Sequence, residues 1–202
     1  ATASFFIELH QSLYYRCQHC EFIFLDPIQR PTPVDEKTKY DLHQNNPEDA
    51  GYRSFLSPVV EEVKKKVDQH AQGLDFGSGP GPTVSVMLEE MGIRCCNYDP
   101  IYQPDVSVLQ ETYDFITCTE VIEHCFDPLS EIQRMKDMLK PSGFIVLMTL
   151  FFDDPADFEH SHYHRDPTHV GFFNRKVFQW IGKHLDLSCT FPHRNVVHFD
   201  IQ

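Results

Sequence analysis

The sequence predicts an α/β fold in which helices cover both faces of a doubly wound, mostly parallel sheet. From residue 57 onward, short apolar runs alternate with amphipathic helical patterns, which is the order that builds a parallel sheet. A glycine-rich turn joins the first run to the next helix, and an acidic residue ends the second run. These observations favour a ligand site at the carboxyl ends of the strands.

The composition is that of one packed domain with a small appendage. Of 202 residues, 41% are apolar and 23% are charged, so a sizeable core can form. Lysine and arginine number 17 against 30 acids, a net charge of −13, which disfavours duplex nucleic acid as a partner. The sequence shows no long apolar run and no leader pattern, and it contains seven cysteines. We therefore predict a reduced, cytoplasmic protein without membrane spans.

The first helix is expected to begin at Ser57, with Pro58 in its first turn and acidic residues beside its amino end. Its apolar residues recur every four positions from Phe55 to Val67, and the helix should end before Gly73. A strand over 73–76 follows directly.

The remaining elements follow from the same patterns. We expect helices at 84–91, 128–139 and 174–184, strands at 94–99, 113–118 and 144–150, and a terminal strand pair at 187–191 and 196–199. Only 13 residues separate Asp99 from Tyr113, so the segment between them must be abbreviated.

Residues 1–50 differ from the rest and are predicted to form an arm before the main domain at 51–202. The arm is rich in aromatic residues, carries a Cys17-x-x-Cys20 knuckle, and continues into a stretch rich in proline and polar residues. We expect a short hairpin followed by an extended connection.

The glycine turn is the first candidate ligand site. Gly77, Gly79 and Gly81 lie between a strand and a helix, and Asp99 stands eighteen residues further on. Loop amides at a helix amino terminus suit an anionic group, and a carboxylate at the next strand end can accept ribose hydroxyls. Pro82 occupies the position where a dinucleotide-binding loop carries glycine, and no P-loop lysine follows.

From these motifs the chain resembles the class I S-adenosylmethionine-dependent methyltransferases. Leu74–Gly81 is similar to their first motif. Residues 113–124, with Asp127-Pro128 and 139–143, resemble their fourth-strand motif. The resemblance covers about residues 55–202. It implies a Rossmann-like sheet with an antiparallel terminal strand, S-adenosylmethionine as cofactor and S-adenosylhomocysteine as product.

The resemblance also implies a role for each matching residue. Asp75 and the backbone of Phe76, Gly77, Ser78 and Gly79 would hold the methionine end of the cofactor. Asp99 would accept the ribose hydroxyls, and Pro100 would lie against the adenosine. Cys118 and Thr119 would lie beneath the methionine moiety, and Glu120 and His124 would face the methyl-transfer region. Asp105 is the candidate for the family's adenine-contacting acid.

A histidine-rich segment between Glu159 and Phe173 follows the fifth strand of the main domain. Its Tyr-x-x-Asp-Pro-Thr-His-Val stretch, 163–170, resembles a segment that closes the acceptor side in a bacterial branch of the family. One interpretation places Tyr163, Asp166 and His169 at the acceptor, with His169 or His124 as base. Two others remain open: solvated loop histidines, or a metal site of His160, His162 and His164 with Asp153 or Asp157.

The cysteine knuckle resembles half of a zinc ribbon. A structural zinc ion needs four ligands, and only histidines at 10, 19 and 43 are near in sequence. We therefore predict no bound metal, and an arm that acts as a lid or packing element over the cofactor side.

The predicted function is S-adenosylmethionine-dependent methyl transfer to an unidentified small-molecule or protein acceptor. A base is needed only where the acceptor atom must lose a proton. The alternatives are a non-catalytic module that binds S-adenosylmethionine and an NAD-dependent oxidoreductase.

Overall fold

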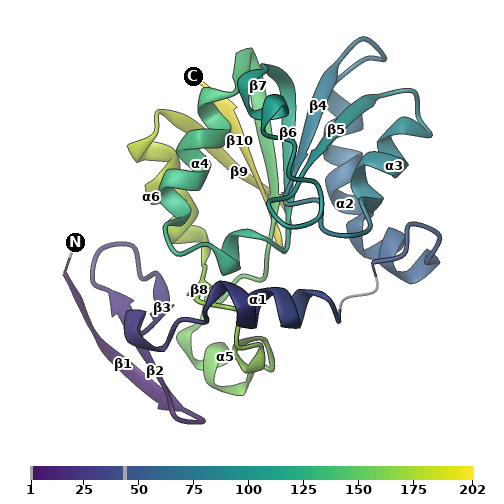
Figure 1. Cartoon of the computed structure of the whole chain (residues 1–202). Helices are drawn as coiled ribbons and strands as arrows, with labels where there is room; N and C mark the ends of the chain where they lie inside the picture. Colours follow the sequence, from purple (N-terminus) through teal and green to yellow (C-terminus); the bar gives the residue numbers. More distant parts are fainter. Residues whose placement is uncertain (1, 43–44) are drawn as a thin grey trace.

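A computed structural model describes residues 2–42 and 45–202. Its larger sheet has six strands in the order β5-β4-β6-β7-β10-β9 (Figure 1). The first four in that order are parallel to one another, and β10 runs antiparallel to both β7 and β9. In chain order these strands are β4 (Gln72–Phe76), β5 (Arg94–Tyr98), β6 (Tyr113–Thr119), β7 (Leu139–Met148), β9 (Leu187–His193) and β10 (Val196–Ile201). The predicted doubly wound fold is confirmed.

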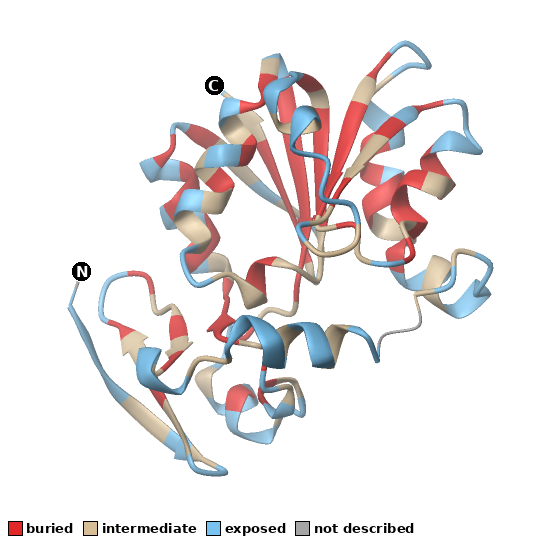
Figure 2. Cartoon of the chain, in the orientation of Figure 1, coloured by how far each residue is buried: buried red, intermediate tan, exposed pale blue. Residues whose placement is uncertain are grey.

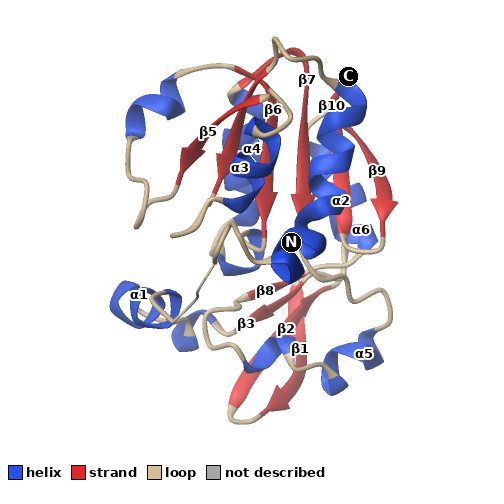
Figure 3. Ribbon diagram, turned by 90° about the vertical axis from the view of Figure 1, so that its right-hand side faces the viewer, coloured by secondary structure: helices blue, strands red, loops and turns tan. Residues whose placement is uncertain are grey.

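Two helical layers cover this sheet, one on each face (Figures 1 and 3). One core joins α4 (Pro128–Asp137) and α6 (Arg175–His184) to the sheet, and another joins α2 (Ala50–Lys66) and α3 (Thr83–Glu89) to it. Alternate residues of β7 enter opposite cores: Ile145 and Leu147 pack toward α4 and α6, whereas Val146 packs toward α2 and α3. This alternation explains the continuous apolar run, because the strand is buried on both faces (Figure 2).

The predicted start of α2 is wrong. Asp49 caps the helix by accepting a hydrogen bond from the Tyr52 amide, so Ser57 lies inside it and Pro58 is an interior proline. The Ser57 hydroxyl donates to the Ser54 carbonyl at 2.9 Å, the carbonyl that a residue-58 amide would otherwise bond. That local substitution allows the helix to continue through the proline.

One further boundary differs from expectation. Residues 139–143, expected to close the preceding helix, form the first part of β7, where Ser142 adopts a positive φ of 68°. The abbreviated segment after Asp99 is confirmed: between β5 and β6 it contains the 3-10 helix η2 (Val106–Gln110). Asp105 caps η2 by accepting from the Ser107 amide at 2.9 Å and is exposed.

The amino-terminal segment forms a second sheet with the histidine-rich region. Its order is β1-β2-β3-β8, made of β1 (Ala3–Leu9), β2 (Ser12–Cys17), β3 (Ile23–Leu25) and β8 (Gly171–Phe172). A third core lies here, in which Tyr14 and Ile23 pack with Phe152 and Phe158. The first fifty residues therefore contact the loop that follows β7.

The expected extended connection contains helical structure. After η1 (Pro27–Gln29) comes α1 (Pro33–Tyr40), which begins at a capping box between Thr32 and Asp35. The histidine-rich region likewise contains α5 (Pro155–His160) and η4 (Tyr163–Arg165), and η3 (Ile122–His124) follows β6. No helix in the described part of the chain is long and apolar enough to cross a membrane.

Candidate active site

A pocket of about 1330 Å³ lies at the carboxyl ends of β4, β5 and β6. The glycine turn and the loop after β5 form one wall, and residues 119–125 with part of 162–169 form the opposite wall. Helix α1 lies across it (Figures 1 and 3). The pocket is therefore built where a doubly wound sheet is expected to bind its ligand.

The glycine turn is fixed to the end of β5. The amides of Gly77 and Ser78 both donate to the Tyr98 carbonyl, at 2.7 and 3.1 Å. Gly77 has a φ of 80°, and a Cβ there would stand 2.4 Å from Val121 Cγ2. Glycine at this position thus allows both the turn and the close approach of the loop after β6.

Asp99 organises the adjoining wall. One carboxylate oxygen accepts from the Gly79 amide at 3.1 Å, and the other accepts from the amides of Ile101 and Tyr102 at 2.8 and 2.9 Å. The carboxylate thereby ties the glycine turn to the loop after β5. Pro100 lines the same wall, as do Phe76, Gly77, Ser78 and Gly79.

Two predicted cofactor residues, Asp75 and Cys118, do not line the pocket. Asp75 is 2% exposed, and its carboxyl accepts a hydrogen bond from the Thr117 hydroxyl at 2.7 Å. Burial raises the pKa of Asp75 to about 7, with a smaller contribution from Asp99 in the same direction. Cys118 is also buried, and burial raises the pKa of its thiol.

The opposite wall contains two carboxyl groups that share one phenol. The Tyr163 hydroxyl donates to Glu123 and lies 3.2 Å from a Glu120 carboxylate oxygen, while the Thr149 hydroxyl donates to Glu123 at 2.9 Å. Glu123 is fully buried and Glu120 adopts a positive φ of 53°. Burial and then the Glu123 charge raise the pKa of Glu120 to about 9.

His124 and His169 lie side by side on this wall. Their ring centroids are 4.7 Å apart, and the Tyr163 ring packs tilted against the His169 ring at 4.1 Å. His124 Nδ1 lies 2.9 Å from the Thr168 carbonyl, and His169 Nδ1 lies 2.7 Å from the Tyr163 carbonyl. Because a carbonyl only accepts, each Nδ1 carries a proton and donates it, so Nε2 is the ring nitrogen left for other contacts. Burial lowers the pKa of His169.

Asp166 stabilises the segment that carries His169. Its carboxylate accepts from the Thr168 amide and hydroxyl at 3.0 and 2.6 Å, and Lys39 Nζ lies 3.2 Å away. Burial opposes ionisation, but the Thr168 hydrogen bonds exceed it and hold the pKa of Asp166 at about 2. The four predicted catalytic residues, His124, Tyr163, Asp166 and His169, all line the pocket.

The extended histidine ligand set is not formed. His160 ends α5 and is exposed, whereas His164 is in η4, buried against Tyr14 and Phe158. Helical turns therefore replace the extended segment that would have placed the alternating histidines on one face. Of the three, His162 lines the pocket.

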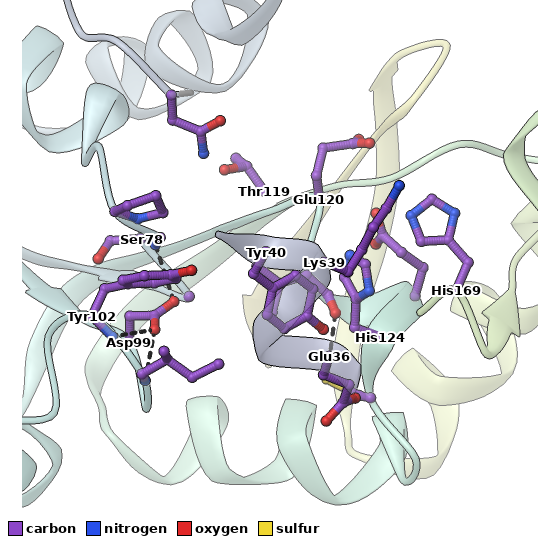
Figure 4. A pocket seen from close by; sticks show the side chains of 18 of the residues that line it. Glu36, Lys39, Tyr40, Ser78, Asp99, Tyr102, Thr119, Glu120, His124 and His169 are labelled. Atoms are coloured by element: carbon purple, nitrogen blue, oxygen red, sulfur yellow. Dashed lines mark hydrogen bonds between the residues drawn. The ribbon is translucent and has the colours of Figure 1, made fainter. Parts of the chain in front are cut away.

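Helix α1 contributes residues that the sequence reasoning missed. Figure 4 shows Tyr40 with Asp99 and Tyr102 on one side and His124 and His169 on the other. The Tyr40 ring packs edge-on against His124 at 5.2 Å, and Asp41 accepts from the Tyr102 hydroxyl at 2.7 Å. The capping box at Thr32 was the sequence pattern that could have revealed this helix. Glu123 was also missed, although it lies within the fourth-strand motif.

The cysteine knuckle lies away from this pocket, between β2 and β3. Cys17 and Cys20 are both buried and both free. His19 is exposed and the His10 ring stacks on His164 at 5.9 Å, while His43 lies outside the described residues.

Comparison with known proteins identifies the family. Residues 23–190 match the profile of a family described as a methyltransferase domain. The chain belongs to that family. Its domain is a class I S-adenosylmethionine-dependent methyltransferase domain, as predicted, and this assignment replaces the nicotinamide alternative.

Curated relatives share part of the chain. The ubiquinone biosynthesis O-methyltransferase of Actinobacillus pleuropneumoniae is 31% identical over 96 residues, which cover 46% of this chain and 41% of that protein. The enzyme of the same name from Aliivibrio fischeri is 32% identical over 92 residues, covering 46% and 39%. The matched region thus spans about two fifths of the length of these relatives.

Solved structures share the fold. Magnesium protoporphyrin IX methyltransferase from Synechocystis PCC 6803, with bound SAH, superposes with a TM-score of 0.58 at 13% identity, over 83% of this chain and 93% of that one. An O-methyltransferase family protein from Burkholderia thailandensis gives 0.59 at 13% identity, over 86% and 64%.

Proposed function

We propose that this protein transfers the methyl group of S-adenosylmethionine to a hydroxyl oxygen of a small molecule. The observation that carries the proposal is that two imidazoles, His124 and His169, line the pocket opposite the glycine turn, and the Nδ1 atom of each is hydrogen-bonded to a backbone carbonyl. An oxygen acceptor must lose a proton as the methyl group arrives, and basic nitrogen atoms promote that loss. The similarity to O-methyltransferases of ubiquinone biosynthesis supports the same acceptor atom.

In this proposal the cofactor lies along the glycine wall. The backbone of residues 76–79 holds the methionine end, and Asp99 accepts the ribose hydroxyls, with Pro100 against the adenosine. Asp75, Cys118 and Thr119 support the methionine moiety from below, and Glu120 faces the methyl-transfer region. The ammonium and sulfonium of the cofactor are cations, so their binding favours the ionised form of nearby carboxyl groups.

The acceptor lies on the opposite wall. Tyr163 and Asp166 position the segment that carries His169, and α1 covers the space between the walls. We propose residues 1–50 as an arm that closes the pocket over the domain at 51–202. The knuckle and the 163–170 motif support placement in the bacterial branch described above. A net charge of −13 and a partly enclosed pocket favour a small molecule over duplex nucleic acid.

The cofactor assignment is tested by titrating S-adenosylhomocysteine into the wild type and the Asp99→Asn variant in a calorimeter. The variant replaces a charged acceptor with a neutral one, so binding should weaken by about 1–3 kcal/mol, roughly 5- to 150-fold. Asp105→Asn is the matched control, because Asp105 caps a short helix outside the pocket. It should bind like the wild type.

Turnover separates the enzyme from a binding module. Incubation with S-adenosylmethionine and a panel of phenols, alcohols, amines and thiols should yield S-adenosylhomocysteine with hydroxyl compounds. Tight binding of S-adenosylhomocysteine without turnover of any acceptor would favour the non-catalytic alternative. Methylation confined to amines or thiols would contradict the proposed acceptor atom.

A further inference from the structure

The acceptor wall brings three metal-ligand side chains together. One ligand atom from each of Glu123, His124 and His169 lies within 4.8 Å of the other two. Within residues 2–42 and 45–202, no other three His, Cys, Asp or Glu side chains meet this criterion. All three line the pocket, so an ion bound to them would be open to a ligand.

The two histidines are oriented as metal ligands usually are. In most metal sites the ring nitrogen that does not bind the metal donates to a carbonyl or carboxylate, which fixes the tautomer and the ring orientation. Here His124 Nδ1 bonds the Thr168 carbonyl at 2.9 Å and His169 Nδ1 bonds the Tyr163 carbonyl at 2.7 Å. In each ring Nε2 is therefore the nitrogen left to bind a metal.

The carboxylate is positioned in a similar way. Glu123 is fully buried, and its two oxygens accept from the hydroxyls of Thr149 and Tyr163. Glu120 lies against the same phenol at 3.2 Å. In the described part of the chain, no Lys, Arg or His nitrogen lies within 4.0 Å of either carboxylate. The buried Glu123 carboxylate has no cationic partner within that distance, which favours binding of a positive ion.

We propose that Glu123, His124 and His169 bind one zinc ion. Two imidazole nitrogens and one carboxylate, with a fourth position open to the pocket, are the donor set of catalytic zinc sites. Zinc ligands lie about 2.0–2.2 Å from the ion, so the three donor atoms, which lie within 4.8 Å of one another, would move closer together when zinc binds. This site deepens the proposed function, on which it rests for its use: the open position would hold an oxygen atom of the acceptor.

Zinc titration of chelator-treated, dialysed protein tests the proposal. The wild type should bind one equivalent, while His169→Gln should weaken binding by more than the roughly 10–100-fold that loss of an outer partner costs. Tyr163→Phe removes one donor to Glu123 and should weaken binding within that 10–100-fold range. His160→Gln is the matched control because His160 is exposed and outside the pocket, and it should bind zinc like the wild type.

The cysteines require a second readout. Cobalt in place of zinc should show visible bands without the near-ultraviolet thiolate-to-cobalt band that Cys17 or Cys20 would give. The proposal is overturned if the wild type binds no zinc. It is also overturned if binding survives His169→Gln but disappears in Cys17→Ser or His160→Gln.

Titration of S-adenosylhomocysteine into the same samples measures cofactor binding alone. Binding of S-adenosylhomocysteine without zinc would overturn the metal site and leave the proposed function standing. Zinc binding without S-adenosylhomocysteine binding would overturn the proposed function and leave the metal site standing. His169→Gln that still binds S-adenosylhomocysteine also shows that the variant is folded.

Discussion

The Asp75 carboxyl lies beneath the glycine turn, where it costs stability when it ionises. Its only side-chain hydrogen bond in the described structure is from Thr117, and burial raises its pKa from 3.8 to about 7. The carboxyl is protonated in both the folded and unfolded chains below pH 4. Between pH 4 and 7 the unfolded chain loses the proton first, so the stabilising contribution of the protonated form is lost as pH rises.

We expect Asp75→Asn to remove this dependence. Above pH 7 the ionised Asp75 lowers the free energy of unfolding by on the order of 4 kcal/mol, because its pKa differs by about three units between the folded and unfolded chains. The variant should therefore gain stability relative to the wild type by roughly 2–3 kcal/mol more at pH 8 than at pH 5. Urea unfolding of both proteins at the two pH values measures this. An equal difference at pH 5 and pH 8 would show that Asp75 does not titrate in this range.

At the scale of single residues, local motifs could be predicted and long-range partners could not. Gly77 and Asp99 belong to a turn whose geometry is encoded within about twenty residues of sequence. Glu123 becomes buried only because Thr149 and Tyr163 reach it from another loop. Asp75 was placed in the correct motif, but the sequence did not show that its side chain lies under the pocket rather than in its wall.

Helix α1 is largely exposed and lies over the pocket. None of its eight residues is buried, and Figure 2 shows it largely exposed. Polar contacts fix its carboxyl end to both walls: Lys39 pairs with Asp166 at 3.2 Å, and Asp41 accepts from Tyr102 at 2.7 Å. A helix with no fully buried residue can open at low cost.

We therefore expect the double variant Lys39→Met, Tyr102→Phe to release S-adenosylhomocysteine faster. Each contact contributes about 0.5–1.5 kcal/mol, so the dissociation rate should rise roughly 5- to 150-fold. Surface plasmon resonance measures the rate. Lys65→Met is the matched control, since it removes a pair between the exposed Lys65 and the buried Glu62 on α2, outside the pocket. An unchanged rate in the double variant would mean that α1 does not restrain the cofactor.

Element types were predictable where periodicity was strong, and boundaries were not. The strands of the main sheet follow from apolar runs that are buried on both faces. Pro58 suggested a helix start, but tertiary packing of Leu56 and Val60 extends α2 in the amino-terminal direction. Helix α1 has no apolar stripe, because its packing is polar, so only its capping box could indicate it.

Across the whole molecule, the two walls of the pocket rest on different cores. The glycine wall is supported by the cores on the two faces of the six-stranded sheet. The acceptor wall is supported in part by the third core, where Tyr14 of β2 packs against Phe158 and Phe172 at 5.0 and 5.6 Å. This pairing joins residues about 140–160 apart in sequence, so no local pattern could predict it.

The division between cores predicts that damage to the arm separates the two binding reactions. Tyr14→Ala should destabilise the protein by about 2–5 kcal/mol through the cavity it leaves. Zinc binding and turnover should fall sharply, because His169 lies in the segment this core supports. Affinity for S-adenosylhomocysteine should fall no further than in the Lys39→Met, Tyr102→Phe double variant, since the cores that support the six-stranded sheet are unchanged.

Tyr14→Phe is the control that keeps the ring, because it removes only a long hydrogen bond of 3.3 Å to the His164 carbonyl. It should behave nearly like the wild type in all three measurements. Titration calorimetry with zinc and with S-adenosylhomocysteine on the same Tyr14→Ala sample decides the matter, because retained cofactor binding also shows a folded sheet. A parallel loss of both affinities would mean that the two walls depend on one cooperative core, and that the arm stabilises the whole pocket rather than its acceptor side.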